Sequence, residues 1–583
     1  MCGIAGLVFD TPSSPGEIKK TVTSMSRAQQ ARGPDALYAW SNERVGLSTV
    51  RLGIVGSAGR AEQPFVGRNG HRLIFNGELY SPNEVMSKLG SDFVDGSCDG
   101  LALLRLLEEK GVNGLRDAEA MFGLALLEPD GSVLLARDAW GQKPLFVARQ
   151  NNHWAFASTI AAMHQALGPL KIQTEAMIEC LIYKSVGGLK SSFEGIRQVA
   201  PGGWMRLKPD GTSEEGFWFQ WPDIDDRHAT TDNVRRLLEK SIEQRCPTDI
   251  PCAVFLSGGL DSGIVATVAT EKLKRLGLPL PHVFTVGYET GGWRDEHNLA
   301  IQHAKELGLE RTTITVEAKD VPDLMRDTAI ALEDSIHDPV TVSTLALCRA
   351  AADDTRVVLT GDGSDEFWGG YSRFGNVPSN LDDYLARTTI FNYRELGLAE
   401  PPASYLNGVP VPNAALSPLD RVLRLEESNR LHNYHLSRVD KLSMGCSLEA
   451  RSPFLDLAVT QGAVSYSAAA KRPGDKPKKL LIDAFRDSLP QWLIDRRKQP
   501  FTVPVQAWLS GELKSFAHDT LNRDSFVSQF MNPADYLDSF QKLVSSENPD
   551  DRSKDAMAMK VWSLLHLEIW HQSFASKMKK QPS

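Results

Sequence analysis

The sequence lacks the features that mark membrane and secreted proteins. No apolar run in its 583 residues approaches the roughly 18 residues that a membrane-spanning helix requires. The N-terminal stretch MCGIAGLVFD has no basic region and already carries Asp10, so it does not resemble a signal peptide. Its seven cysteines are an odd number and show no CxxC pair or His/Cys metal spacing. We therefore expect reduced thiols and a cytoplasmic location.

The sequence also has fewer basic residues than acidic ones. The chain has 64 Lys and Arg against 73 Asp and Glu, a net charge of −9. A nucleic-acid binder would instead show a basic stripe. We expect small-molecule substrates, with no nucleic-acid or membrane partner, and we consider a homodimer as the assembly. The length exceeds what one hydrophobic core supports, so two or more domains are expected.

The first 200 or so residues read as mostly β-structure with a few helices. Short apolar stretches such as Gly3–Phe9, Val45–Val50 and Phe122–Leu127 are separated by Gly, Pro and Asn. Leu101–Lys110 has the periodicity of a helix. The polar stretch Pro222–Thr231 reads as a linker. We place the domains at residues 1–220 and 221–583.

Beyond the linker the pattern changes to strand–loop–helix units. Cys252–Leu256, Val283–Gly287 and Val357–Thr360 are short and fully apolar. Such strands are typical of a parallel sheet that is covered on both faces. The last 200 or so residues are predicted to be mainly helical, and the tail Lys577–Ser583 to be frayed.

Cys2 is the cysteine whose position suggests a catalytic role. It follows Met1 and precedes Gly3. Removal of Met1 would place the thiol beside a free α-amine, whose ordinary pKa is about 8. Such an amine serves as the base in N-terminal nucleophile hydrolases. A cysteine at position 2 is often accidental, so the interpretation depends on further motifs.

Four motifs accompany Cys2 in order: RGPD at Arg32–Asp35, RLGIV at Arg51–Val55, NGE at Asn76–Glu78 and RDAWGQKPL at Arg137–Leu145. Together they resemble the class II glutamine amidotransferase domain over nearly all of the first 200 or so residues. The resemblance implies an α+β N-terminal nucleophile hydrolase fold, an αββα sandwich, that hydrolyses glutamine.

The resemblance also implies roles for individual residues. Arg51 would clamp the glutamine α-carboxylate, because a guanidinium offers a bidentate fork. The Asn76 side chain and the Gly77 N–H would form the oxyanion hole, and Glu78 would bind the substrate ammonium. The implied glutamine-binding set is Arg51, Leu52, Ile54, Val55, Asn76, Gly77, Glu78 and Asp99.

Two positions depart from the family pattern. Ala31 stands where the family has His before RGPD. Ser97–Gly100 reads SCDG where the family has Ser-Asp-x-Glu, so the acidic residue is displaced by one position. Asp99 could take that role through a local backbone shift. Whether Cys98 or Asp99 occupies the ammonium site stays open.

A phosphate-binding loop is predicted at Ser257–Ser262. The motif SGGLDS follows an apolar strand and precedes a helix. Gly258 and Gly259 let the backbone approach a phosphate, and the helix N-terminus and two hydroxyls supply donors. The motif lacks the GK[ST] of a Walker A loop. It resembles the PP-loop signature of enzymes that cleave ATP between the α and β phosphates and adenylate a carboxylate.

Carboxylates follow the next strand. Gly361–Tyr371 reads GDGSDEFWGGY and resembles the family's GEGxDExFGGY, with Asp362 in place of Glu. Concentrated acids at a strand's end suit Mg²⁺, which bridges nucleotide phosphates; we expect Asp261 and Asp365 to be its ligands. The implied ATP- and pyrophosphate-binding set is Leu256, Ser257, Gly258, Gly259, Asp261, Ser262, Val286, Thr360 and Gly361.

Later motifs extend the resemblance almost to the C-terminus. Arg438–Asp456, the segment from Lys478, and Arg496–Leu509, with Pro500 for Gly, resemble the glutamine-hydrolysing asparagine synthetase family. The resemblance implies an α/β domain of the adenine nucleotide alpha hydrolase type with a helical C-terminal part. Lys478 would neutralise charge on the acyl-adenylate. The implied catalytic residues are Cys2, Asn76, Gly77, Asp362 and Lys478.

The predicted function is glutamine-dependent amidation of an adenylated carboxylate with ATP and Mg²⁺. L-Aspartate is the expected acceptor, and a sugar acid or secondary-metabolite intermediate is the alternative. A β-lactam synthetase-like cyclase would not need Cys2, Arg51 and NGE. A catalytically silent glutamine-binding regulator is a remote alternative. We also expect an apolar passage for ammonia between the two sites, with Met444 as a lining residue or plain core.

Overall fold

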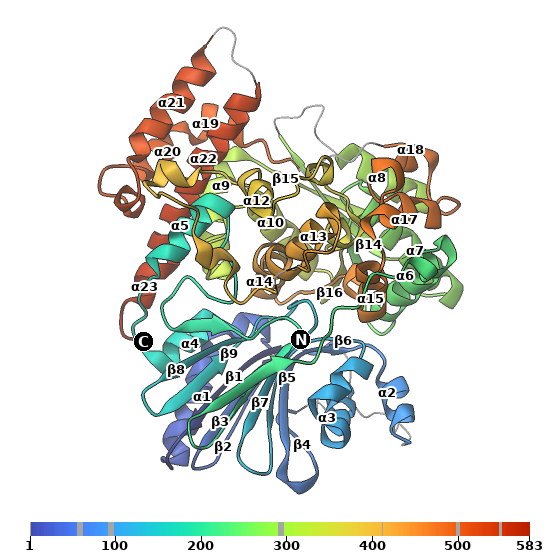
Figure 1. Cartoon of the computed structure of the whole chain (residues 1–583), viewed down its shortest axis with the longest axis vertical. Coiled ribbons are helices and arrows are strands. Elements are labelled where there is room, and N and C mark those ends of the chain that lie inside the picture. Colours follow the sequence, from blue (N-terminus) through green and yellow to red (C-terminus); the bar gives the residue numbers. More distant parts are fainter. Residues whose placement is uncertain are drawn as a thin grey trace.

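The computed structural model describes residues 2–54, 62–90, 98–289, 297–410, 412–496, 502–546 and 551–582. The chain forms two parts stacked along the long axis of the molecule (Figure 1). Strands β1 to β12 make the N-terminal part, and everything from α6 (Thr231–Arg245) onward makes the C-terminal part.

The N-terminal part consists of two antiparallel sheets of six strands each, in the orders β10-β8-β9-β1-β3-β2 and β12-β11-β7-β6-β5-β4. The first sheet contains β1 (Cys2–Phe9), β2 (Ala36–Ser41), β3 (Val45–Arg51), β8 (Phe146–Gln150), β9 (His153–Ala157) and β10 (Ile196–Gln198). The second contains β4 (Phe65–Val66), β5 (Arg72–Leu79), β6 (Ala120–Leu127), β7 (Val133–Arg137), β11 (Gly203–Leu207) and β12 (Ser213–Phe217).

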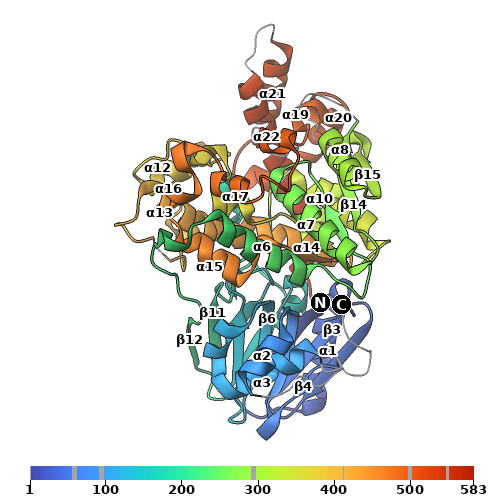
Figure 2. The same cartoon turned by 90° about the vertical axis from the view of Figure 1, so that its right-hand side faces the viewer.

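An apolar core fills the space between the two sheets, with Ile4, Ile74 and Phe156 fully buried in it. Helices cover both outer faces, which explains why central strands such as β1 are apolar on both sides. The first sheet is covered by α1 (Pro15–Ala28) and α4 (Ile160–Leu167) (Figure 1), and the second by α2 (Pro82–Lys88) and α3 (Asp99–Lys110) (Figures 1 and 2). The predicted αββα sandwich is confirmed.

The C-terminal part is built on a parallel sheet of five strands in the order β15-β14-β13-β16-β17. Its strands are β13 (Ala253–Phe255), β14 (His282–Tyr288), β15 (Arg311–Val316), β16 (Val357–Leu359) and β17 (Glu449–Arg451). The chain proceeds outward from β13 in one direction and then from β16 in the other. Ligands bind at such a switch point, beyond the carboxyl ends of the strands. The predicted parallel sheet is confirmed.

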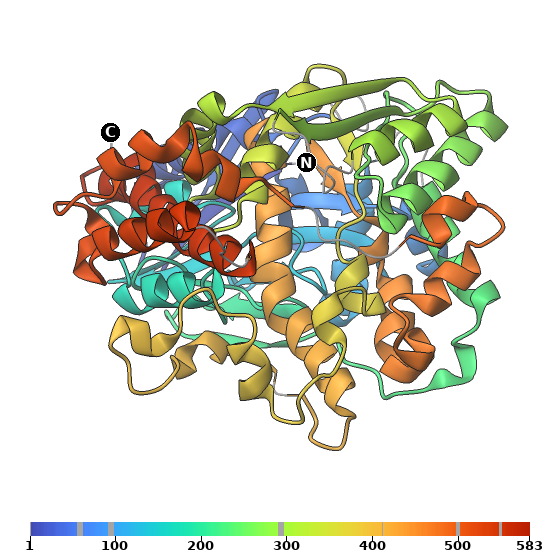
Figure 3. The ribbon, with the colours of Figure 1, turned by 90° about the horizontal axis from the view of Figure 1, so that it is seen from above.

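Helices make up most of the rest. One continuous helix runs from α13 (Pro418–Leu425) through a π-helical segment, η10 (Glu426–Leu436), into α14 (Ser437–Gly445). It lies across the N-terminal part (Figure 3). π-Helical turns occur frequently at functional sites. Other helices are α5 (Thr174–Tyr183), α7 (Leu260–Leu276), α9 (Val321–Leu332), α10 (Val340–Ala352), α17 (Lys479–Ala484) and α22 (Asp551–Trp570).

The C-terminal tail returns to the N-terminal part, so the expectation of a frayed tail was wrong. The Leu170 N–H donates to the Met578 carbonyl at 2.7 Å, and His164 Nε2 lies 2.8 Å from the Lys580 carbonyl oxygen. Terminal backbone stays ordered when it is tied down in this way. None of the helices in the described ranges combines the length and the apolar character needed to cross a bilayer.

Candidate active sites

Cys2 begins β1 and lies opposite Arg51 of β3. The cysteine is buried, and its backbone N–H donates to Asn76 Oδ1 at 3.3 Å. Gln63 Nε2 lies 3.5 Å from the sulfur. Burial raises the pKa of the Cys2 thiol, and Thr49 and Arg51 oppose the shift only in part. The thiol is therefore neutral at rest and requires a base when it acts as a nucleophile.

Asn76 places an unused donor beside the thiol. It is fully buried in β5, and its Nδ2 has no hydrogen-bond partner among the described residues. An unsatisfied buried donor costs about 1–3 kcal/mol, so it is an apt place for a ligand oxygen. A Cβ at the neighbouring Gly77 would lie 2.0 Å from the Met121 carbonyl oxygen, which only glycine avoids.

Two carboxylic acids stand next to this centre. Burial raises the pKa of Glu78 to about 8, and Arg451 of the C-terminal part opposes the shift with Nη2 3.5 Å from Glu78 Oε1. Asp99 Oδ2 accepts from the Leu79 N–H at 3.2 Å, and burial raises its pKa as well. Cys98 instead packs into an apolar cluster. The structure thus brings Asp99, and not Cys98, to Glu78.

The remaining residues predicted to bind glutamine follow β3 in the chain. Leu52 and Ile54 are buried and pack with Met121. The same cluster includes Val357 and Met444 from the C-terminal part, so it crosses the boundary between the two parts. Val55 lies outside the described residues.

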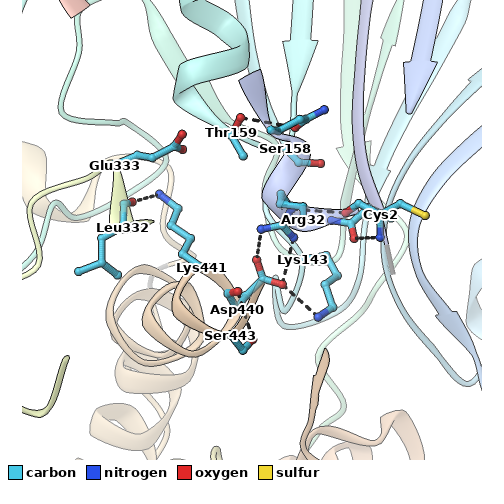
Figure 4. Close-up of polar contacts among 12 residues, drawn as sticks. Cys2, Arg32, Lys143, Ser158, Thr159, Leu332, Glu333, Asp440, Lys441 and Ser443 are labelled. Carbon is cyan, nitrogen blue, oxygen red and sulfur yellow. Dashed lines mark hydrogen bonds and ion pairs between the residues drawn. The ribbon is translucent and has the colours of Figure 1, made fainter. Parts of the chain in front are cut away.

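A buried ion-pair network joins the parts beside Cys2 (Figure 4). Arg32 Nη1 lies 2.9 Å from Asp440 Oδ2, and Lys143 Nζ lies 3.0 Å from Asp440 Oδ1. Arg32 Nε also donates to the Cys2 carbonyl at 3.4 Å. The three side chains are at most 5% exposed. Sequence reasoning missed this network, although each member lies within one of the quoted motifs.

The PP-loop lies between β13 and α7, and contacts between its first and last residues hold it together. Gly258 has φ 73°, a conformation that favours glycine. The Ser257 N–H donates to Ser262 Oγ at 3.2 Å, and the two hydroxyl oxygens lie 3.1 Å apart. Gly259 is the N-cap of α7, which leaves the helix N-terminus open toward an anion.

Lys478 joins the loop to the second acidic motif. Its Nζ lies 2.7 Å from Asp261 Oδ1 and 2.6 Å from Asp365 Oδ1, and the lysine side chain is 4% exposed. A Cβ at Gly370 would lie 1.8 Å from Asp365 Oδ1 and 2.1 Å from Lys478 Cε. The GGY motif is therefore glycine-rich because this lysine and carboxylate pass so close to the backbone.

The predicted Mg²⁺ ligands have the right chemistry for a metal that arrives with a nucleotide. Among the described ranges no group of three or more His, Cys, Asp or Glu could hold a metal alone. Mg²⁺ commonly takes only one or two protein carboxylates and completes its shell with phosphate oxygens and water. Asp261 and Asp365, which share the Lys478 ammonium, fit that pattern.

Two cavities meet at the PP-loop. One, of about 430 Å³, lies at the switch point. It contains most of the predicted nucleotide-binding residues, namely Leu256, Ser257, Asp261, Ser262, Val286, Thr360 and Gly361. The other, of about 820 Å³, shares Ser257 and Asp261 with it. Its lining is strongly basic: Lys476, Lys478, Lys479, Arg486 and Arg496. Such a lining suits pyrophosphate.

Asp362 also lines the 430 Å³ cavity, where burial raises the pKa of its carboxyl. Arg438 Nη2 lies 4.0 Å away and opposes the shift. The same wall includes Arg430, Tyr434 and His435 of the continuous helix. Sequence reasoning recognised little before Arg430 and missed these residues. They belong to none of the motifs on which the resemblance rests.

Comparisons with known proteins match this layout. A family model described as asparagine synthase matches residues 233–572, and one described as a glutamine amidotransferase domain matches residues 1–218. Asparagine synthetase [glutamine-hydrolyzing] 1 of Bacillus subtilis is 24% identical, over 98% of this chain and 96% of its own length. Asparagine synthetase B of Escherichia coli is 26% identical, over 91% and 88%. Amidase chry2 of Gibberella zeae is 29% identical, over 64% and 60%.

Proposed function

The chain belongs to the asparagine synthase family, and we propose that it transfers the amide nitrogen of glutamine to an adenylated carboxylate, with L-aspartate as the acceptor. The observation that carries this proposal is the pair of buried reactive centres on either side of one boundary. Cys2 and Asn76 lie on one side, and the PP-loop with Lys478 on the other. We place the domain boundary at residues 220 and 221, between β12 and α6.

In the proposed glutaminase reaction, the Cys2 sulfur adds to the glutamine side-chain carbonyl carbon. The thiol proton passes to the α-amine of a mature N-terminal Cys2 and then to the departing ammonia. Asn76 Nδ2 and the Gly77 N–H stabilise the oxyanion. Arg51 holds the α-carboxylate, while Glu78 and Asp99 hold the α-ammonium. Water then hydrolyses the thioester to glutamate.

In the proposed synthetase reaction, the acceptor carboxylate attacks the α-phosphorus of ATP and pyrophosphate leaves. Ammonia then attacks the acyl carbon and AMP leaves. Ser257, Ser262 and the α7 N-terminus bind phosphate oxygens, and Lys478 stabilises charge on them. Mg²⁺ held by Asp261 and Asp365 would neutralise the phosphates.

A passage for ammonia is proposed along the boundary. The cluster of Leu52, Ile54, Met121, Val357 and Met444 is apolar and spans it. Because such a passage excludes water, ammonia would stay unprotonated and the adenylate would not be hydrolysed. A separate, more polar void of about 20 Å³, large enough for one water-sized molecule, lies between residues of the two parts. Its lining includes the Lys143 and Asp440 pair and also residues of the 430 Å³ cavity.

Amidation of another carboxylate is the second candidate. The similarity to a protein named as an amidase supports it, as do the departures at Ala31 and Asp362. A silent regulator is disfavoured because both centres retain their reactive residue types. A homodimer and a cytoplasmic location stay predictions.

The test is a screen of carboxylates for AMP release with glutamine, ATP and Mg²⁺. We expect one amide, one AMP and one pyrophosphate per glutamine consumed, with L-aspartate. ADP and phosphate as products would contradict the PP-loop interpretation. When ¹⁵N-ammonium competes with ¹⁴N-glutamine, the product should carry mainly ¹⁴N. A product that mirrors the bulk pool would contradict the passage.

A further inference from the structure

The helix α5 of the glutaminase part ends in an unusual residue. Lys184 follows it with φ 73° and ψ −6°, the left-handed conformation. Glycine is the usual residue at such a helix end. A side chain there costs roughly 1–2 kcal/mol. Strain of this kind clusters where surrounding structure enforces it for a function.

The surrounding contacts hold this turn against the synthetase part. The Lys184 carbonyl accepts from the His337 N–H at 2.8 Å. Four residues on, the Gly188 N–H donates to Asn429 Oδ1 at 3.0 Å, and Asn433 Nδ2 donates to the Gly188 carbonyl at 2.8 Å. Both asparagines belong to η10, so the turn is docked on the helix that forms the cavity wall.

The Lys184 side chain lines the 430 Å³ cavity although it comes from the other part of the chain. Within the described ranges its ammonium has no hydrogen bond and no ion pair. Burial lowers the pKa of this ammonium to about 8, and Asp338 opposes the shift. At neutral pH the group is still mostly charged.

The cations around Lys184 differ in whether they form an ion pair. Arg438 pairs with Asp338, and Arg373 Nη2 lies 2.7 Å from Glu426 Oε2. Arg430 has no carboxylate within 4.0 Å among the described residues, and its Nε has no partner. Its guanidinium lies over the Tyr434 ring, 4.6 Å from the centroid. Lys184 and Arg430 are thus the two cations of this wall that make no direct ion pair among the described residues.

We propose that Lys184, together with Arg430, binds a carboxylate of the acceptor other than the one that is activated. The acceptor is then at least a dicarboxylic acid, and the glutaminase part supplies a specificity-determining residue to the synthetase site. The reaction itself rests on the proposed function; the ligand recognition does not require turnover.

The experiment measures binding to the full-length chain by calorimetry, with a non-hydrolysable ATP analogue and Mg²⁺ present. Two probes are compared: L-aspartate, and L-isoasparagine, in which an amide replaces the α-carboxylate. We expect the wild type to prefer L-aspartate by roughly 10-fold or more, since losing a hydrogen bond to a charged group costs about 1.5–3 kcal/mol. In Lys184→Gly the preference should fall to roughly 3-fold or less, through weaker binding of L-aspartate alone.

Glycine is the sharpest substitution because it fits φ 73° without strain. The variant should unfold no more easily than the wild type and keep glutamine hydrolysis, so lost discrimination is not lost folding. Lys184→Arg should restore part of the preference. Asn151→Gly is the matched control: it relieves a φ of 48° in an exposed turn and should leave the preference unchanged.

Persistent discrimination in Lys184→Gly would overturn the proposal. So would a wild type that binds none of L-aspartate, L-glutamate, succinate and L-malate. Failure of the proposed function would look different: discrimination would be intact, and no AMP or amide would form from any of these acids.

Discussion

The two reaction centres differ in how many segments they need. The glutaminase centre draws Cys2 and Arg51 from paired strands of one sheet and Asn76 from the second sheet of the same sandwich. The synthetase cavity collects residues from Lys184 to Ala450, which includes a turn of the other part. A centre carried on the two sheets of one sandwich is shaped by one core. A centre assembled from distant segments exists only while both parts are docked.

The centres also differ in charge. The glutaminase centre holds acids whose pKa values burial raises, Glu78 and Asp99, beside a single unused amide donor. Of the synthetase cavities, the 820 Å³ one holds an excess of lysine and arginine, and the 430 Å³ one mixes acids with cations. The first suits a zwitterion with one developing negative charge, and the second suits a polyanion. The contrast predicts that a mutation can impair either chemistry while largely sparing the other.

The largest expected effect comes from Cys2→Ala. Glutaminase activity should fall by a factor on the order of 10⁴ or more, because the nucleophile is gone. Synthesis from ammonium salts should persist, since the second cavity contains no part of Cys2. The measurement is glutamate and amide formation with either nitrogen source. Cys98→Ala, a buried cysteine of the same part, is the matched control. Loss of both activities in Cys2→Ala would end the idea of separable centres.

Asp440→Ala tests whether docking holds the second centre together. It leaves Arg32 and Lys143 buried without a counter-charge, which costs about 3–5 kcal/mol of unfolding free energy. The expected result is a lower urea midpoint, with ammonium-dependent synthesis more affected than glutamine hydrolysis. Glu215→Ala breaks the exposed pair with Arg197 and should change stability by about 1 kcal/mol at most. If Asp440→Ala and Glu215→Ala lowered the stability equally, the buried ion-pair network would contribute no more than an exposed pair.

Asn76→Ala sharpens the account of the glutaminase centre. Removal of one oxyanion donor typically lowers kcat by about 10²–10³. The KM for glutamine should change little, because the donor acts on charge that develops during reaction. Steady-state glutamate release measures both. A KM effect without a kcat effect would mean that Asn76 binds the ground state instead.

The smallest effect concerns pH. Burial raises the pKa of Glu78 to about 8, so the neutral acid predominates at pH 7. Binding of the glutamine ammonium needs the carboxylate, and kcat/KM for glutamine should therefore rise between about pH 6.5 and 8.5, by up to roughly 25-fold. Glu78→Gln should have a lower kcat/KM for glutamine and should lose the rise of kcat/KM with pH. An identical slope in both proteins would assign the titration to another group.

Much of the local structure was readable from the sequence. Apolar runs bounded by Gly and Asn predicted β1, β3, β6 and β14 nearly to the residue, because strand formation follows the local apolar pattern. The SGGLDS loop fell between a strand and a helix as expected, since glycine and hydroxyl positions there have local causes. The family and its two chemistries followed from the order of the motifs.

Other features were decided only by the tertiary structure. The sequence places Arg32 and Asp440 408 residues apart, and no local pattern indicates that they meet. Lys184 stands where a helix end would favour glycine, and only docking against η10 brings it into the cavity. The tail's contact with Leu170 is likewise invisible in sequence. Local propensity depends on neighbours along the chain, whereas pairing of buried charge depends on which distant surfaces pack together, and that choice is made by the whole fold.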